Sequence, residues 1–122
     1  MITAKNRRKL ARGTTAALEA TVRFVDAAYE TVERETKRVS KLVEFFDVDA
    51  REGGADVREK LNNIHAECRA IATAVYCSAN AIVRYRNVGA VVAEANKVAE
   101  QEDRVVELRR AAVALLSEEG AR

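Results

Sequence analysis

His65 and Cys68 are the pair of side chains whose types and spacing best suit a metal ion. They lie three residues apart, so a helix would place them on one face. Zinc normally takes four protein ligands, whereas the chain holds one histidine and two cysteines. Cys77 follows Cys68 by nine residues and points to another side of the same helix. We therefore interpret Cys68 as a small buried residue and predict no metal and no cofactor.

The segment DVDAREGGADVR, residues 47 to 58, resembles a calcium-binding loop only in its first three positions. An EF-hand needs an oxygen ligand at the fifth position, glycine at the sixth and glutamate at the twelfth. This chain has Arg51, Glu52 and Arg58 there. No Ser-His-Asp arrangement and no glycine-rich phosphate loop occur elsewhere in the sequence. We predict that the protein is not an enzyme.

A basic arm opens the chain, with five positive charges and no acidic residue among the first twelve positions: Lys5, Arg7, Arg8, Lys9 and Arg12. Such a segment suits phosphate backbones, to which binding weakens steeply with salt. It also suits anionic lipid head groups. A third interpretation is a solvated helix extension that keeps the protein soluble. If the first two helices form an antiparallel hairpin, Arg84 and Arg86 come to the same end as the arm. This basic end makes nucleic-acid binding the alternative function.

The elements that must position these residues are helices. The 122 residues include no proline and only five glycines, and alanine, glutamate and arginine are good helix formers. Apolar residues recur in alternating steps of four and three from Leu18 to Phe46, and again from Val57 to Tyr85. This heptad-like spacing predicts two long amphipathic helices. On the outer face of the first helix, Glu30 with Arg34 and Glu33 with Lys37 stand in the favourable acid-first order.

The clear break between these helices is the segment from Asp47 to Asp56, because the pair Gly53 and Gly54 favours turns. We expect Asp56 to cap the second helix, with Glu59 three residues later. A broader apolar face continues after Asn87, where the phase shifts. Either a tight turn there gives three helices, at about residues 15 to 46, 55 to 86 and 89 to 118, or one helix of about 64 residues runs on for roughly 95 Å. We favour the compact three-helix arrangement.

Fourteen consecutive residues without a charge, from Ala70 to Val83, lie in a chain in which one residue in three is charged. A helix packed on one side needs an apolar stripe of about 100°, yet this stretch is uncharged around its whole circumference. We therefore expect a second subunit to cover the side that the helix's own bundle leaves open. The interface residues predicted from the helical spacing are Ala70, Ala74, Cys77 and Ala81.

The fold class that the sequence predicts is all-α. We expect a long antiparallel hairpin or a three-helix up-down-up bundle that packs further in a homo-oligomer. Residues 1 to 13 form the basic arm and residues 14 to 122 the bundle domain. The uncharged run is too short for a transmembrane helix, which needs roughly 20 apolar residues, so we expect a soluble cytoplasmic protein. The function predicted first is a non-catalytic structural or protein-interaction module that self-associates.

Overall fold

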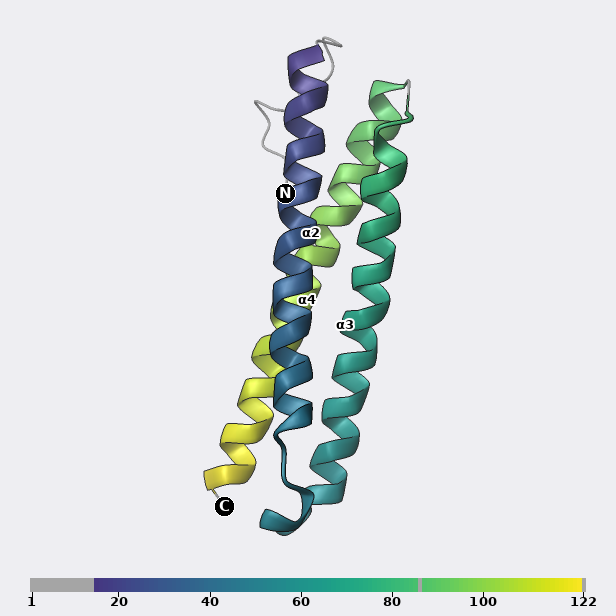
Figure 1. Ribbon diagram of the computed structural model, residues 1–122. Coiled ribbons are helices and arrows are strands. Elements are labelled where there is room, and N and C mark those ends of the chain that lie inside the picture. The colour runs from purple at the N-terminus through teal and green to yellow at the C-terminus, as the bar shows by residue number, and fades with distance from the viewer. Residues whose placement is uncertain (1–14, 86, 122) are drawn as a thin grey trace.

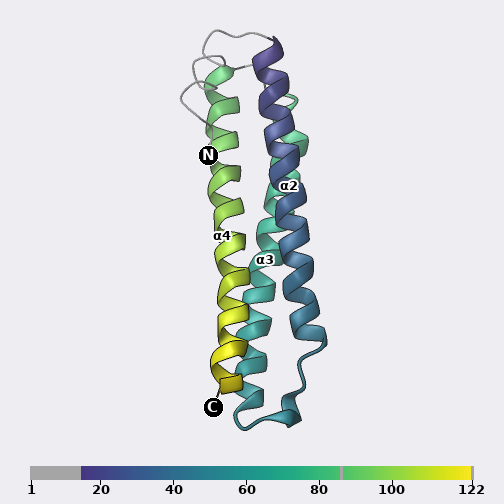
Figure 2. The same cartoon turned by 90° about the vertical axis from the view of Figure 1, so that its left-hand side faces the viewer.

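The computed structural model describes residues 15–85 and 87–121, and over this part of the chain it contains three long helices and no strand. The helices are α2 (Thr15–Glu44), α3 (Gly54–Ile82) and α4 (Val88–Ala121), with a single 3-10 turn, η1 (Val48–Ala50), between α2 and α3. They run up, down and up beside one another, so α2 and α4 are parallel and α3 is antiparallel to both (Figures 1 and 2). The predicted all-α three-helix bundle is confirmed.

The turn between α3 and α4 decides between the two predicted architectures. The chain leaves the helix after Ile82, and α4 begins at Val88. The Oδ1 atom of Asn87 accepts a hydrogen bond from the Ala90 backbone N–H at 3.1 Å, which satisfies one of the free donors at a helix start. The alternative of one continuous helix is therefore wrong, because Asn87 stabilises a new helix at the position where the apolar phase shifts.

The core lies along the bundle axis, and its largest side chains are mostly valines. On α2 the fully covered residues Val25, Val32 and Val39 recur every seven positions, while the alternate positions of the same row are half-buried. The remaining buried apolar side chains of the helices are Ala28 on α2, then Val57, Leu61, Cys68, Val75 and Ile82 on α3, and Val91, Ala95, Val98, Ala99, Val105, Leu108 and Ala112 on α4. Small and medium side chains of this kind let long helices approach closely along most of their length.

Polar contacts between helices fix the lengthwise register of the bundle. The Nε atom of Arg109 on α4 lies 2.8 Å from Oε2 of Glu35 on α2. Arg104 on α4 donates from Nε to Oε1 of Glu67 on α3 at 2.9 Å. The hydroxyl of Ser78, which is buried, donates to the Glu94 carboxylate across the α3–α4 contact. Each of these pairs would break if one helix slid by a turn along its neighbour.

The loop between α2 and α3 ends in the two glycines that the sequence marks as a turn. Gly53 adopts the left-handed region at φ 73°, and α3 begins directly after it at Gly54. The prediction that Asp56 caps this helix is wrong, because the helix starts two residues earlier and its cap position is Gly53, which has no side chain to offer. Asp56 instead lies in the first turn and forms an ion pair with Lys60 at 3.1 Å.

Phe46 closes the end of the bundle at which this loop lies. Its ring is buried, and two guanidinium groups sit over it, with the centroid 5.2 Å from Arg51 and 5.9 Å from Arg58. Arg58 also donates from Nη2 to the Phe46 carbonyl at 2.9 Å, and Arg51 donates to the carbonyl of Leu116 on α4 at 3.4 Å. These contacts attach the loop to both α3 and α4.

Candidate interaction surfaces

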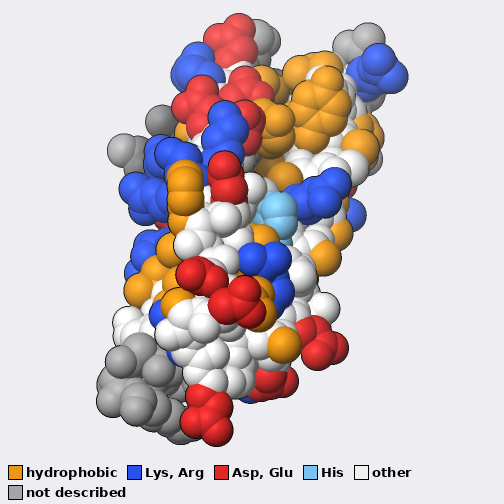
Figure 3. Space-filling view, turned by 60° about the horizontal axis from the view of Figure 1, so that its bottom comes forward, with side chains coloured by type: hydrophobic (Ala, Val, Ile, Leu, Met, Phe, Trp, Pro, Cys, Tyr) orange, Lys and Arg blue, Asp and Glu red, His pale blue; other side chains and the backbone are white. Residues whose placement is uncertain are grey.

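The side of α3 that faces away from α2 and α4 is an uncharged surface from Ala70 to Val83. Six residues of this side are exposed, and we call them the outer face of α3: Ala70, Thr73, Tyr76, Cys77, Asn80 and Val83. Tyr76 is 54% exposed and Val83 is 60% exposed. Hydrophobic side chains gather over the upper part of α3 in Figure 3. Apolar groups of this size in contact with water favour association with another apolar surface.

The four residues predicted for an oligomer interface do not share one environment. Ala70 and Cys77 are exposed on the outer face of α3, whereas Ala74 and Ala81 are half-buried. The helical spacing puts Ala74 and Ala81 on the same side as Ser78, which contacts Glu94 of α4. Ala70 and Cys77, seven residues apart, are therefore the positions at which a substitution changes the outer face with least effect on the bundle.

One edge of this outer face is an aromatic pair that joins α3 to α2. The rings of Tyr29 and Tyr76 have centroids 5.7 Å apart and planes inclined by 52°, a tilted arrangement that aromatic pairs favour. A hydrogen bond to the Glu33 carboxylate raises the pKa of the Tyr29 hydroxyl. Because Tyr29 holds one side of the Tyr76 ring, the other side of that ring remains available to a partner.

His65 and Cys68 are not brought together with further metal ligands. Cys68 is fully buried in the core, and burial raises its pKa to about 11, so its thiol keeps its proton near neutral pH. His65 is half-buried, and burial lowers the pKa of its imidazole. Within residues 15–85 and 87–121, no group of three or more histidine, cysteine and acidic side chains is placed to hold a metal ion.

The predicted basic end falls only partly within the described residues. Lys5, Arg7, Arg8, Lys9, Arg12 and Arg86 lie outside them. Arg84 is exposed just beyond the end of α3, at the pole where α2 begins. The opposite pole carries four exposed acidic side chains on the loop and the first turn of α3: Asp47, Asp49, Glu52 and Asp56. The described part of the bundle is thus acidic at the loop end.

Phe45 is an exposed aromatic side chain that the sequence pattern did not single out. Phe45 is 77% exposed, although the next residue, Phe46, is buried. Together with Lys41, Leu42 and Leu116, both rings line a shallow hollow at the end of α2. The signal was present in the spacing, because the row of apolar positions from Leu18 ends on Phe46 and leaves Phe45 on the charged side of the helix.

Comparisons with known proteins identified no relative of this chain. No protein-family model matches the chain, and the searches of curated proteins and of solved structures found no match either. None of the helices in the described residues combines the length and the hydrophobicity that crossing a bilayer requires. The surfaces of the bundle are therefore the basis for a functional hypothesis.

Proposed function

We propose that the protein is a non-catalytic helical bundle that self-associates through the outer face of α3 and serves as a structural or protein-interaction module. The observation that carries the proposal is the exposure of Tyr76 and Val83 on a surface without charges, in a chain with 33% charged residues. The two cysteines are free, which fits the reducing cytoplasm that we expect as its location.

The chemistry of this face favours a second copy of the same chain. Alanine and threonine let two helix backbones approach closely, as Ala70 and Thr73 would do at the centre of a helix pair. Burial of Tyr76 and Val83 would supply the hydrophobic contribution. Asn80 lies among them with an exposed side-chain amide, and an amide near a two-fold axis can bond to its own symmetry mate, which fixes the register of a helix pair.

Two glutamates placed on the outer face of α3 test the proposal. The variant Ala70→Glu with Cys77→Glu puts like charges into each copy of the contact, where a desolvated charge costs several kcal/mol. We expect a lower molar mass by light scattering, with helicity by circular dichroism close to that of the unchanged protein.

The matched control is Ala55→Glu with Asn62→Glu, which has the same spacing and lies at exposed positions nearer the start of α3. We expect this control to associate like the unchanged protein. A protein that is monomeric at every concentration tested would disprove the proposal. If the Ala70 and Cys77 variant lost both its helicity and its association, the proposal would also be disproved, because this face would then belong to the monomer's own core.

A second candidate function is nucleic-acid binding by the basic arm together with the basic pole of the bundle. The exposed side chain of Arg84 favours it, because Arg84 lies at the pole where α2 begins at Thr15, directly after the arm. Binding to a duplex of random sequence should then weaken steeply when salt is raised. Affinity that is unchanged after removal of the first twelve residues would exclude the arm as the binding element.

A further inference from the structure

Three rows of exposed residues run along the side of α3 that faces away from α2 and α4. Residues seven positions apart are separated by two helical turns, so each row follows the helix as a nearly straight line. Val83 keeps helical backbone angles after α3 ends at Ile82, so the rows continue into the turn. They are Asn62, Arg69, Tyr76 and Val83 beside α2, then Glu59, Ala66, Thr73 and Asn80 in the centre, and Asn63, Ala70, Cys77 and Arg84 beside α4.

Three residues of these rows are charged, and their charges are not used within the described part of the chain. Glu59, Arg69 and Arg84 form no ion pair with another described residue. The other exposed charged residues of α3 have ion-pair partners: Asp56 and Lys60 with each other, and Glu67 with Arg104. The order of the unused charges along α3 is one acidic residue and then two basic residues. A second copy complements this order only when its α3 runs in the opposite direction.

We propose that two copies of this chain pack through α3 with the helices antiparallel, related by a two-fold axis at the level between Ala72 and Thr73. The arrangement rests on the self-association proposed above and gives it an orientation and a register. In such a pair each flanking row faces the same row of the second copy, run in the opposite direction. Residues at one level then have numbers that add up to about 145.

This register places Arg69 of one copy opposite Tyr76 of the other, because both belong to the row beside α2. Tyr76 is 54% exposed, and Tyr29 covers one side of its ring at a centroid distance of 5.7 Å. The guanidinium group can therefore lie against the other side, where a cation is attracted to the face of an aromatic ring. The contact occurs twice. The two Arg69 residues are about 10 Å apart along the helices, where their repulsion is largely screened.

An ion pair forms at each end of the same arrangement. Glu59 in the central row lies within about 3 Å, measured along the helices, of the level of Arg84 of the second copy in the adjacent row. The antiparallel direction also brings the acidic loop end of each bundle beside the pole at which Arg84 is exposed. Glutamates introduced at Ala55 and Asn62 would lie at this basic end and would not be repelled.

Small side chains occupy the centre of the proposed contact. Thr73 lies at the axis, and Ala70 of one copy meets Cys77 of the other within the row beside α4. Residues of this size let two helix backbones approach closely. Asn80 lies away from the axis, within one turn of the level of Asn62 of the second copy, so the two amides can bond to each other.

A parallel pair in register would meet three like-charge contacts. Each residue of the central row would face its own mate, so Glu59 would face Glu59, and the flanking rows would bring Arg69 near Arg69 and Arg84 near Arg84. The Asn80 amides could bond to each other across such an axis, but the antiparallel pair offers Asn80 the amide of Asn62. The charges therefore favour the antiparallel direction.

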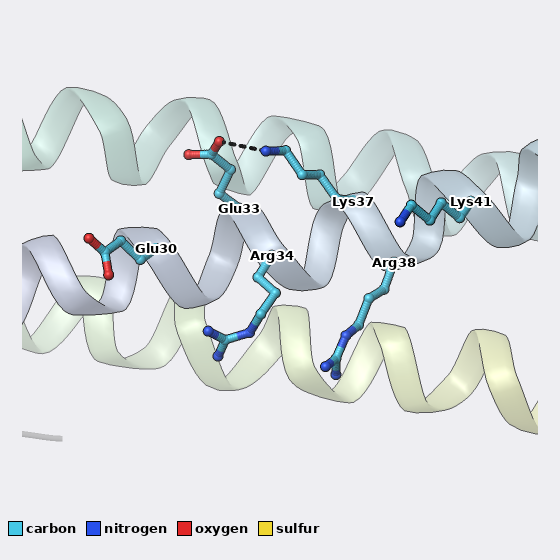
Figure 4. A pocket seen from close by; sticks show the side chains of 6 residues that line it. All are labelled: Glu30, Glu33, Arg34, Lys37, Arg38 and Lys41. Atoms are coloured by element: carbon cyan, nitrogen blue, oxygen red, sulfur yellow. Dashed lines mark ion pairs between the residues drawn. The ribbon is translucent and has the colours of Figure 1, made fainter.

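The exposed side of α2 does not offer an alternative contact of this kind. Figure 4 shows that charged side chains of both signs follow one another along it: Glu30, Glu33, Arg34, Lys37, Arg38 and Lys41. Glu33 and Lys37 already pair within the helix at 3.2 Å. Removing water from so many charges is costly, so the contact remains on α3.

Disulfide cross-linking reports the register directly. In the proposed pair, Cys77 lies about 13 Å along the helices from Cys77 of the second copy, beyond the reach of a disulfide, but close to the level of Ala70. With a mild oxidant such as diamide, we expect the unchanged protein to stay free of cross-links and the variant Ala70→Cys to form a linked dimer. The control Ala70→Cys with Cys77→Ser should not cross-link, because two residues 70 are also too far apart.

Exchange of the end charges tests the orientation without a cross-link. Glu59→Arg or Arg84→Glu alone should weaken association at low salt at least about fivefold, because each puts like charges at both ends. The two changes in one chain should restore the affinity within about twofold. Glu100→Arg and Lys97→Glu, at exposed positions of α4, make the same changes in net charge and are the controls. Sedimentation equilibrium measures association, and circular dichroism checks helicity.

The possible results separate this orientation from the self-association on which it rests. A disulfide between the Cys77 residues of the unchanged protein would indicate a parallel pair and would overturn the proposal. Single charge variants that associate like the controls, or a double variant that does not recover, would overturn it as well. In each of these cases the proposed self-association through α3 would stand. A protein that is monomeric at every concentration would overturn both.

Discussion

Glu35 on α2 and Arg109 on α4 form an ion pair in which the glutamate residue is only 6% exposed. The separation between Arg109 Nε and Glu35 Oε2 is 2.8 Å, and the second oxygen of Glu35 lies 3.5 Å from Nη1 of Arg38. A carboxylate at this depth needs such partners, because a buried charge without them is costly. The pair therefore specifies how α2 and α4 align, in a bundle whose apolar layers are chemically alike.

Loss of the negative charge at Glu35 should destabilise the bundle. The variant Glu35→Gln leaves Arg109 without its charged acceptor, and we expect the free energy of unfolding to fall by about 1.5 to 3 kcal/mol. Urea unfolding followed by circular dichroism measures the change. The control is Lys37→Gln, which removes the exposed partner of Glu33 and should cost less than about 1 kcal/mol. Equal effects of the two variants would show that the contact with Arg109 adds no stability.

The two cysteines should differ strongly in their reactivity toward a thiol reagent such as a disulfide dye. Cys77 is exposed, whereas Cys68 is fully buried with a pKa of about 11. At a concentration low enough for the proposed α3 contact to be open, we expect one thiol per chain to react quickly in the folded protein and the second only on unfolding. The variant Cys77→Ser should abolish the fast phase. Rapid reaction of two thiols in the folded protein would contradict the position of Cys68 in the core.

The raised pKa of Cys68 also predicts a loss of stability in alkaline solution. Burial lifts this pKa from 9.0 to about 11, so the folded protein holds the thiol proton more tightly than the unfolded chain does. The stabilisation is complete below pH 9 and is lost as the pH rises through 11, by about 2 kcal/mol. Urea unfolding at several pH values should show this fall. Cys68→Ala should flatten it and Cys77→Ser should not, so equal slopes in the two variants would contradict the assignment.

Adjacent glycines in the loop should respond differently to the same substitution. A Cβ atom on Gly54 would overlap the backbone carbonyl oxygen of Val48, whereas one on Gly53 meets no atom within 4 Å. Gly53→Ala retains only the strain of a positive φ, about 1 to 2 kcal/mol. Gly54→Ala should cost about 3 kcal/mol, because neither backbone can move freely. Thermal unfolding ranks the two variants, and the reverse order would show that the loop packs differently.

The helices themselves could be predicted from the sequence because their cause is local. The alternating steps of four and three residues and the absence of proline predict α2 and α3 within a few positions. The two adjacent glycines predict the loop between them. The turn before α4 was harder to predict. Its stabilising contact is a hydrogen bond from the Ala90 backbone to the Asn87 side chain, and asparagine occurs in helices as well as in turns.

Features that depend on distant residues could not be predicted in this way. The local spacing assigns Thr36 to the apolar row and Glu35 to the outside, yet Glu35 is buried and Thr36 only half-buried. The cause is Arg109, which is 74 positions away along the chain. In the same way, Ala74 and Ala81 were expected on an open face, but they lie on the side of α3 that faces α4. The spacing of apolar residues in α3 does not determine on which side α4 packs, so this position could not be predicted.

The up-down-up order of the helices has a mechanical consequence. Since α2 begins at one pole and α4 ends at the other (Figure 1), tension applied to those two ends would act along the helix axes. The pairs Glu35 with Arg109 and Glu67 with Arg104 would then be sheared at the same time and would not open one after another. A bundle with an even number of helices has both ends at one pole, where the same force would peel its helices apart in sequence. The three-helix arrangement should therefore resist stretching better than a two-helix hairpin built from similar contacts.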